Sequence, residues 1–479
     1  MSQDTNDGDR VNERRRDFLK GLGVATAIGA SGVGVAQTEM NRLQVVDDPI
    51  GNYPYRDWED LYREEWDWDS TARSTHSVNC TGSCSWEVFV RDGQVFREEQ
   101  AADFPRINQD IPDLNPRGCN KGACFKDYVH GEQRVKYPLR RTGERGEGKW
   151  ERIGWDEALD EIAEELIDTV LEGDYDGISG FTPIPAMSPV SFASGSRLVN
   201  LLGGVSHSFY DWYSDLPPGQ PITWGFQTDN AESADWYNSD YIIAWGSNID
   251  VTRIPDAKMF LEARYEGAKT VGVFSDYSQT AIHCDEWLPA EPGSDAALAL
   301  GMARTIVEEE HYDEAHLKEQ SDMPLLVRED TGKFLRASEV PGLAGDEKVM
   351  VMQDADGDLR TAPGSLGDRA GKFDPDSSIE LDFDPQLSVD RTVQTTEGQV
   401  AVRSVWARLR EQLSEYTPDV VYEETGVGEE THQRIAREFA DADRGKIIHG
   451  KGVNDWYHND LGNRAIQLLV TLTGNLGEQ

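Results

Sequence analysis

Four residues in the first quarter of the chain are of the types that bind metals. His76, Cys80 and Cys84 recur at regular intervals, and Cys119 follows later. Three of the five cysteines thus belong to one set with a histidine. Thiolates are soft ligands that select zinc or iron–sulfur clusters, and imidazole can replace one thiolate. The spacing predicts a four-ligand metal centre and leaves open whether the metal is structural zinc or an iron–sulfur cluster.

Two carboxylates further along the chain could also do chemistry. Asp211 and Asp215 lie just before the pair Pro217-Pro218. Two such carboxylates could act as the acid and base of a glycosidase, or could simply cap a turn. On residue types alone the capped turn is the better interpretation.

A third set of candidates consists of small and polar residues that follow short apolar runs. Gly246, Ser247 and Asn248 come directly after one such run. Asp276 follows the next run, and a Gly-Lys-Gly-Val-Asn sequence at 450–454 follows a third. Glycine, hydroxyl and amide groups at strand ends let a phosphate or ribose approach closely. Taken singly, each of these sequences is more typical of an ordinary turn.

The apolar runs before these loops predict strands of a parallel sheet. Residues 240–245 and 269–274 are short apolar segments, and a helical pattern at 257–265 lies between them. Strand, helix and strand in this order form a right-handed parallel crossover. Residues 446–449 predict a further strand of the same α/β body. The polar loops would then lie at the carboxyl ends of strands, where open parallel sheets bind ligands.

Two helices are predicted with defined ends. Apolar residues between 155 and 172 recur at the spacing of one helical face, and Gly173 closes that helix. A Pro-Gly-Ser-Asp sequence opens another helix, for which Ser294 or Asp295 would be a good N-cap.

The remaining pattern predicts smaller elements. Alternation at 85–96 predicts a β-hairpin that turns at an Asp-Gly pair, so the metal ligands would lie on loops around a small sheet. Residues 58–66 predict a short helix and 175–181 a buried strand. Residues 321–400 are rich in Asp, Gly and Pro without a helical period. We interpret them as a β-rich or loop insertion on the surface and assign them no chemistry.

The chain as a whole is strongly acidic. Its 479 residues include 46 Lys and Arg against 88 Asp and Glu, a net charge of −42. This balance argues against nucleic acid as a partner, because phosphate binding needs a basic surface. The carboxylates are spread along the sequence, which is typical of a solvated surface in a high-salt cell, where salt screens their repulsion. The length allows roughly two to four domains.

The amino terminus carries a targeting pattern. Arg15 and Arg16 belong to an RRxFLK sequence that precedes a weakly apolar, glycine-rich run. This pattern is typical of the twin-arginine export signal, which is an address and not part of the fold. No other stretch is apolar enough to cross a bilayer. We expect the two cysteines outside the metal set, Cys124 and Cys284, to be buried small side chains.

The metal-ligand spacing resembles that of a known family once the residues after the last cysteine are included. HxxxCxxxC, a long gap and then CxKG resemble the amino-terminal cluster domain of the molybdenum bis-pterin oxidoreductases, the dimethyl sulfoxide reductase family. The resemblance implies that a 4Fe-4S cluster is bound by His76, Cys80, Cys84 and Cys119. It also implies that Lys121 lies between cluster and pterin and assists electron transfer. A histidine in the first position is the pattern of the nitrate reductase branch.

The same resemblance implies a molybdenum ligand. Residues 208–229 closely resemble the nitrate reductase segment in which an aspartate binds the metal directly. The matching residue is Asp215, and Asp211 is the second choice. A carboxylate is a hard donor that suits oxidised molybdenum beside the soft sulfurs of two pterins. Asn79 matches a residue near the substrate, and residues 183–188 match a segment that lines the cofactor cleft.

The strand-end loops are similar to the nucleotide-binding loops of the family. Residues 292–298 resemble its PGTDxAL helix start, whose aspartate faces the nucleotide. The resemblance therefore implies a second set of cofactor contacts, which bind molybdopterin guanine dinucleotide: Gly246, Ser247, Asn248, Asp276, Gly293, Ser294, Asp295, Gly450 and Asn454.

The implied fold is α/β, with a small iron–sulfur domain and doubly wound parallel-sheet domains that bind the cofactor. The expected organisation is a twin-arginine signal at 1–36, a 4Fe-4S domain at 37–150, an α/β molybdopterin-binding domain at 151–320, the acidic insertion at 321–400 and a continuing α/β segment at 401–479. Members of the family continue into a β-barrel domain that this sequence lacks. We therefore expect an amino-terminal portion of a larger catalytic subunit.

The implied function is that of the catalytic subunit of a respiratory nitrate reductase, with a molybdenum bis(molybdopterin guanine dinucleotide) centre fed by a 4Fe-4S cluster. The implied partners are an iron–sulfur beta subunit, a membrane cytochrome-type electron donor and a small oxyanion. The implied location is the outer face of the cytoplasmic membrane. The alternatives are a chlorate, perchlorate or selenate reductase of the same subfamily, a hydroxylating relative, or a non-catalytic iron–sulfur electron-transfer protein.

Overall fold

The computed structural model describes residues 66–75, 84–103, 105–106, 108–181, 189–207, 217–225, 232–365 and 381–476. These residues form a mixed α/β structure with a four-stranded parallel sheet and several smaller sheets. Several predicted features lie outside the described residues: the export signal, most of the 58–66 helix, the segment 183–188, and His76, Asn79, Cys80, Asp211 and Asp215.

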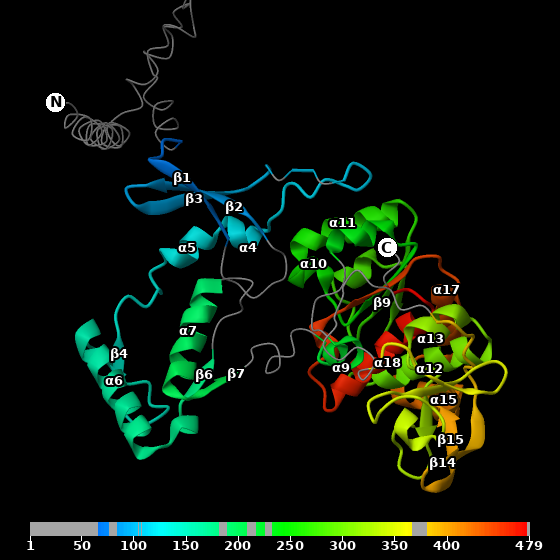
Figure 1. The fold of residues 1–479 in the computed structure, drawn as a ribbon. Helices are drawn as coiled ribbons and strands as arrows, with labels where there is room; N and C mark the ends of the chain where they lie inside the picture. The colour runs from blue at the N-terminus through cyan, green and yellow to red at the C-terminus, as the bar shows by residue number, and fades with distance from the viewer. Residues whose placement is uncertain are drawn as a thin grey trace, which may run out of the picture. The chain divides into compact units, whose positions relative to one another are not determined.

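A small antiparallel sheet comes first in the sequence (Figure 1). Its strands pair in the order β1 (Ser70–Ser74), β2 (Trp86–Arg91) and β3 (Gln94–Gln100). The predicted hairpin is confirmed, because Asp92 and Gly93 form its turn with φ values of 52° and 74°. Positive φ at both positions is what a two-residue hairpin turn requires. Two short helices follow the sheet and contact β3: α4 (Asn120–Ala123) and α5 (Phe125–Val129).

The next segment holds two helices and two pairs of short strands. Its elements are β4 (Leu139–Arg141), β5 (Trp150–Arg152), α6 (Trp155–Glu172), η1 (Tyr175–Gly177), β6 (Ser179–Phe181), α7 (Pro189–Leu202) and β7 (Val205–His207). The predicted helix is confirmed by α6, and Gly173 ends it in the left-handed conformation with φ 79°. The buried strand predicted at 175–181 is wrong in length and burial, since only Gly180 of β6 is buried. The reason is that β6 pairs with β7 alone and α7 packs on the face of Gly180, while Ser179 and Phe181 remain exposed.

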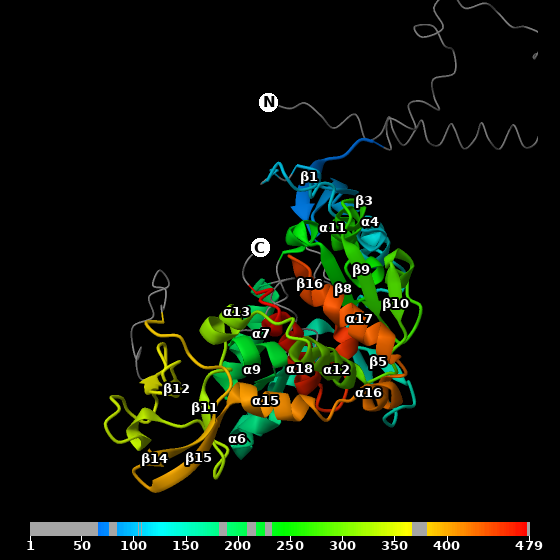
Figure 2. The same cartoon turned by 90° about the vertical axis from the view of Figure 1, so that its right-hand side faces the viewer.

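The parallel sheet follows the order β10-β9-β8-β16 (Figure 2). Its strands are β8 (Tyr241–Trp245), β9 (Lys269–Val273), β10 (Glu286–Leu288) and β16 (Gly445–His449). The predicted strands at 240–245, 269–274 and 446–449 are thereby confirmed. The connection from β8 to β9 contains α10 (Ile249–Thr252) and α11 (Ile254–Tyr265). The strand order reverses between β8 and β16, because the chain moves outward from β8 through β9 to β10 and later returns to the other side of β8.

Helices cover both faces of this sheet, as a doubly wound fold requires. Tyr241, Ile243 and Trp245 on one face of β8 belong to one apolar cluster, and Ile242 and Ala244 on the other face belong to a second. The second cluster includes α11. The first cluster includes α12 (Asp295–Glu308), α17 (Glu429–Ala440) and α18 (Asn459–Leu472), of which α12 and α18 lie side by side (Figures 1 and 2).

The acidic segment at 321–400 contains several short strands and most of one apolar cluster, including Leu326, Val351, Val393 and Val400. The elements between α12 and α17 are α13 (Glu314–Gln320), β11 (Leu326–Arg328), β12 (Val351–Gln353), β13 (Leu359–Thr361), β14 (Asp390–Thr395), β15 (Gly398–Ser404), α15 (Val405–Leu413) and α16 (Pro418–Thr425).

Within the part of the chain that the structure describes, no helix is both long enough and apolar enough to cross a membrane.

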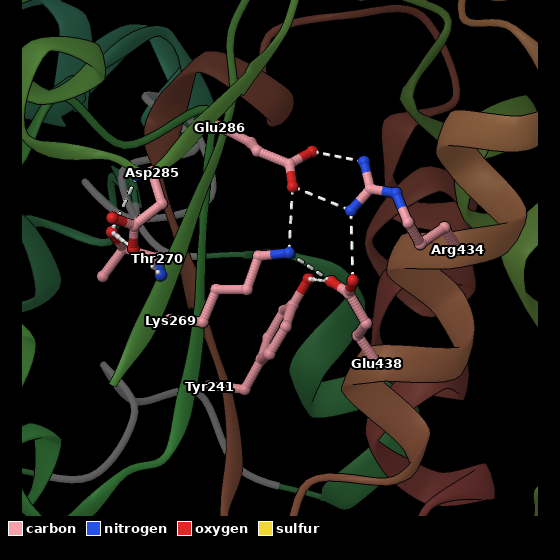
Figure 3. A network of polar contacts seen from close by, with 7 residues as sticks. All are labelled: Tyr241, Lys269, Thr270, Asp285, Glu286, Arg434 and Glu438. Atoms are coloured by element: carbon pink, nitrogen blue, oxygen red, sulfur yellow. Dashed lines mark hydrogen bonds and ion pairs between the residues drawn. The ribbon is translucent and has the colours of Figure 1, made fainter. Parts of the chain in front are cut away.

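A network of charged side chains joins the amino ends of the sheet strands to α17 (Figure 3). Lys269 Nζ lies 2.9 Å from Glu286 Oε1 and 2.5 Å from Glu438 Oε2. Arg434 donates to both carboxylate oxygens of Glu286, at 2.7 and 2.6 Å. Tyr241 Oη also donates to Glu438 Oε2, at 3.0 Å. The two cations and two carboxylates therefore fix the helix to the end of the sheet that lies opposite the polar loops.

This network should make the stability of the fold depend on pH. Hydrogen bonds from Arg434, assisted by Lys269, outweigh the opposite effect of burial and lower the pKa of Glu286 from 4.5 to about 2. A carboxylate with a lowered pKa stabilises the fold fully above its unfolded pKa, and the contribution is lost as the pH falls from about 4.5 to about 2.

We predict that Glu286→Gln lowers the free energy of unfolding at pH 7 by about 1 kcal/mol, allowing for solvent screening. In that pH window, the free energy of unfolding of the variant should fall less steeply with decreasing pH than that of the unmodified protein. Urea unfolding at several pH values measures both effects. Glu424→Gln is the control, because it removes the same formal charge from an exposed position. Equal stabilities of the two variants at pH 7 would contradict the prediction.

Candidate functional site

The loops at the carboxyl ends of the parallel strands meet around one pocket. The pocket has a volume of about 170 Å³. The loops after β8, β9 and β16 and the segment before α12 all contribute to it. Of the residues that the sequence singles out, its lining includes Gly246, Asn248, Asp276, Gly293 and Asp295. Residues far apart in the sequence are thus brought together at the point where the strand order reverses, where open α/β sheets bind ligands.

The loops after β8 and β16 contact each other through their backbones. Gly450 N donates to Trp245 O at 2.8 Å, and Gly452 N donates to Gly246 O at 3.2 Å. A Cβ at Gly450 would overlap the Gly246 carbonyl oxygen, so no larger residue fits there. Gly246 has φ 59° and a Cβ on it would lie 2.6 Å from Val453 Cγ2. These glycines are required by the close approach of two backbones.

Ser247 presents a buried hydroxyl at the end of β8. The residue is 3% exposed, and its Oγ has no hydrogen-bond partner among the described atoms. A buried hydroxyl without a hydrogen-bond partner costs free energy. A ligand that supplies this partner would remove the cost. This orphaned group fits a bound polar molecule at the strand end.

Asn248 shapes the same loop. Its Nδ2 donates to Gln279 Oε1 at 3.0 Å, and its Oδ1 accepts from Thr280 Oγ1 at 3.1 Å. The side chain therefore ties the loop after β8 to the 3₁₀ turn η3 (Thr280–His283) beyond β9. Asp276, also predicted as a contact, is exposed on the loop after β9.

Asp295 faces the pocket from the start of α12. Its Oδ1 accepts a hydrogen bond from Trp245 Nε1 at 2.7 Å. Burial raises the pKa of this carboxyl group, and the bond from Trp245 opposes that effect only in part. The predicted N-cap at Ser294 is correct in position, but its hydroxyl donates to Glu291 O at 2.7 Å and makes no capping bond. The reason is that Ser294 has φ −93° and ψ 7°, outside the extended conformation from which a cap oxygen accepts a hydrogen bond from the first turn.

The sequence did not identify Trp456, which lines the pocket, or Asn463, which bonds to the predicted contact Asn454 behind the loop after β16. Trp456 Nε1 donates to Gly452 O at 3.2 Å, and the ring packs on Gly293, where a Cβ would lie 3.1 Å from it. Asn454, which is buried, accepts from Asn463 Nδ2 at 3.0 Å. A tryptophan after a glycine-rich loop was the only sequence signal for Trp456. Nothing local marks Asn463, because its partners are distant in sequence or on another element.

Two of the four predicted cluster ligands are described. Cys84 and Cys119 are both buried. A backbone hydrogen bond of 3.4 Å from Ser85 N to Arg117 O joins the two segments beside them. The indole of Trp86 packs so closely on the chain around Cys119 that a Cβ at Gly118 would lie 2.7 Å from it.

The other two predicted cluster ligands are His76 and Cys80. His76 and Cys80 lie outside the described ranges, and within those ranges no three His, Cys, Asp or Glu side chains gather as a metal site would require. Lys121 is exposed on α4, two residues after Cys119.

The expectation for the remaining cysteines is wrong for Cys124, which is exposed. α4 is a single turn at the surface, and the Cys124 thiol donates to Asn120 O at 3.0 Å instead of packing inward. Cys284 is partly buried, and burial raises the pKa of its thiol to about 12.

The comparison with known families decides what kind of protein presents this pocket. The family model for molybdopterin oxidoreductases matches residues 134–479, which is well over half of the chain. The protein belongs to the molybdopterin oxidoreductase family. The match includes every loop of the pocket described above.

Relatives within the family are similar over almost the whole chain. The chain is 71% identical over 473 residues to "Respiratory nitrate reductase subunit alpha" of Haloferax mediterranei, covering 97% of this chain and 48% of that protein. It is 41% identical to "Perchlorate reductase subunit alpha" of Dechloromonas aromatica, covering 98% and 51%. The chain therefore spans about half the length of the curated relatives it matches.

A solved structure agrees with the fold. The acetylene hydratase of Pelobacter acetylenicus superposes with a TM-score of 0.55 and 21% identity, over 85% of this chain and 44% of that one. At this identity the likeness supports the molybdopterin oxidoreductase fold and nothing further.

The close approach of the loops generates a prediction about Gly450. We expect Gly450→Ala to destabilise the protein by about 1–3 kcal/mol, the usual cost of overpacking, because its Cβ would meet backbone that cannot move aside. Gly428→Ala is the matched control, since a Cβ at Gly428 meets nothing within 4 Å. Chemical unfolding of both variants measures the difference. A Gly450 variant as stable as the control would show that the two loops separate readily.

Proposed function

We propose that this chain belongs to the catalytic subunit of a respiratory nitrate reductase, which reduces nitrate to nitrite. The observation that carries the proposal is the 71% identity to the nitrate reductase subunit alpha of Haloferax mediterranei, which extends over 97% of this chain. The pocket at the reversal of strand order supports it, because its loops belong to the matched family region.

The residues of the pocket fit the nucleoside end of a molybdopterin guanine dinucleotide. Among the described residues that line the pocket, the charged ones are all acidic: Asp276, Glu291 and Asp295. Carboxylates accept hydrogen bonds, so they suit the N–H edge of guanine and the hydroxyls of ribose. Asp295 would hold the base edge, and Asp276 would bind the ribose.

The phosphates of such a ligand would lie against the glycine loops. The orphaned Ser247 hydroxyl can donate to a phosphate there, and the contact between Gly246 and Gly450 holds the two loops in place beside it. When bound, the molybdenum centre supplies the oxygen-atom transfer. The chain contributes binding and orientation, and Asp215 would be a protein ligand to the metal.

Electrons would reach this centre through a 4Fe-4S cluster held by His76, Cys80, Cys84 and Cys119. Arg117, two residues before the last ligand, forms a 2.6 Å ion pair with Asp256 on α11. Both side chains are largely buried, at 14% and 5% exposed. This contact supports a fixed distance between cluster loop and α/β body, which electron transfer through Lys121 requires.

Partners and location are part of the same proposal. An iron–sulfur beta subunit and a membrane cytochrome-type donor would supply electrons, and twin-arginine export would place the enzyme on the outer face of the cytoplasmic membrane. Perchlorate and chlorate are the alternative substrates, since reductase subunits with those names are 41% and 36% identical to this chain.

Nitrite formation by the exported holoenzyme, with a reduced viologen dye as donor, tests the proposal. We expect nitrite from enzyme of molybdate-grown cells and none from tungstate-grown cells, assayed in high salt to screen the acidic surface. If the molybdenum-loaded enzyme forms no nitrite but reduces chlorate or perchlorate, that oxyanion is the substrate in place of nitrate. An enzyme without molybdenum would leave only the electron-transfer alternative.

The metal ligand can be tested separately. We predict that Asp215→Ala lowers kcat by at least about 100-fold, because an electrostatic or ligand contact at the reacting centre is lost. The electron paramagnetic resonance signal of the 4Fe-4S cluster should persist. Asp211→Ala is the control, and we expect it to remain within about threefold of the unmodified enzyme. If Asp211→Ala is the inactive variant, the assignment passes to Asp211.

A further inference from the structure

One short stretch of this acidic chain is basic. Residues 117–152 contain 10 Lys and Arg against 5 Asp and Glu, whereas the whole chain contains 46 against 88. Six exposed cations of the stretch form no ion pair with the carboxylates that the structure describes: Lys121, Arg134, Lys136, Arg141, Arg145 and Arg152. A cation that stays unpaired among so many carboxylates keeps its charge available for another molecule.

The hairpin of β4 and β5 presents a basic and apolar face. Leu139 pairs with Arg152, and Arg141 pairs with Trp150. Opposed residues of an antiparallel pair share a face, as do alternate residues of one strand. These four side chains therefore lie on one face, which we call the outer face, and all four are exposed. Tyr137 extends it, since Arg152 Cζ lies 3.2 Å from the centre of its ring.

The opposite face of the hairpin is occupied within the chain. Arg140 pairs with Glu151 across the hairpin at 2.6 Å and with Glu157 on α6 at 2.8 Å. It also pairs with Glu161 of the same helix. These ion pairs fix the inner face on α6. The outer face therefore stays accessible, with Trp150 57% exposed.

The outer face belongs to the segment that follows the predicted cluster ligand Cys119. α4 begins at the next residue, and α5 follows it. Arg134 Nη1 donates to Val129 O at 2.8 Å, which ties the approach to the hairpin to the last residue of α5. A molecule that covers the outer face would therefore contact the part of the chain that continues from the cluster ligand.

We propose that the outer face docks an acidic surface of the iron–sulfur subunit that supplies electrons. The inference rests on the proposed function, in which such a subunit feeds the cluster. A partner that works in the same salt is expected to be acidic as well, and two acidic surfaces repel each other. Docking then requires cations on one side of the contact, and this stretch provides them.

The apolar side chains of the outer face suit the same role. At about 1 M salt the Debye length is about 3 Å, so only cations that touch a carboxylate contribute to docking. Burial of apolar area is not screened by salt. Tryptophan, tyrosine and arginine are enriched among the residues that dominate binding at protein interfaces. The outer face combines all three.

The charges are tested by combining Lys136→Glu, Arg141→Glu and Arg145→Glu in the full-length chain. Analytical ultracentrifugation in about 1 M salt measures its dissociation constant for the purified iron–sulfur subunit. We expect this constant to rise at least about tenfold, because attractive contacts become repulsive. Nitrite formation with the viologen dye should stay within about twofold, since a small dye needs no docking surface.

The matched control combines Lys333→Glu, Lys348→Glu and Arg410→Glu. These three cations are also exposed and also form no ion pair with a described carboxylate, so the control makes the same change in net charge. Its dissociation constant should stay within about twofold of that of the unmodified chain.

A second pair of variants tests the apolar contribution. Tyr137→Ala should raise the dissociation constant at least about fivefold, as truncation of an interface tyrosine does. Tyr422→Ala is its control, because Tyr422 is 60% exposed on α16 and lies outside the basic stretch. This pair carries the test if the triple variant does not fold, which the electron paramagnetic resonance signal of the cluster reports.

The outcomes separate this inference from the function on which it rests. Equal dissociation constants for the variants and their controls would overturn the docking surface. So would an unchanged constant combined with lost binding to phosphatidylglycerol vesicles, or with lost self-association of the full-length chain. An unmodified enzyme that forms no nitrite would overturn the proposed function, whereas the dissociation constants would still test the docking surface.

Discussion

Two backbone hydrogen bonds between the loops after β8 and β16 determine the rest of the site. They join Gly450 to Trp245 and Gly452 to Gly246, just beyond the paired strands. Because the strand order reverses at this pair, the crevice beside it opens at the carboxyl edge of the sheet. The contact requires backbone to touch backbone. Glycine is therefore needed on both sides, and the polar residues that follow are brought around one pocket.

Trp245 couples this site to the core of the sheet. Its ring is fully buried in the cluster that packs α12, α17 and α18 on one face. Its indole N–H binds Asp295 at the start of α12. The carboxylate in the pocket is thus held by a core side chain, and a shift of α12 on the sheet would move that carboxylate. The charge network of Lys269 and Glu438 restrains α17 at the opposite end. The carboxyl end of the sheet therefore forms the pocket, and the amino end is where the charge network holds α17.

Local patterns predicted the strands and loops of the parallel sheet, because their signals lie within a few residues. The run at 241–245 is apolar throughout, as expected of a strand buried on both faces. The sequence predicted less well wherever burial depends on distant partners. The strand in 175–181 is short and packs on α7 through Gly180, while its neighbours Ser179 and Phe181 are exposed, and Cys124 follows a one-turn helix at the surface. The sequence did not identify Asn463, because its hydrogen-bond partners Gly219 and His449 lie on other elements.

The distribution of charge restricts how an anionic cofactor can bind to so acidic a chain. The net charge is −42, and the charged residues among the described ones that line the pocket are Asp276, Glu291 and Asp295. Carboxylates repel phosphates but accept hydrogen bonds from base and sugar. Under the proposed function, a dinucleotide would therefore enter with its nucleoside in the pocket and its phosphates beside the loops after β8 and β16, where the orphaned Ser247 hydroxyl can donate to them. High salt screens the repulsion from the surrounding carboxylates. The affinity then depends on the geometry of these loops, which the contact between Gly246 and Gly450 maintains.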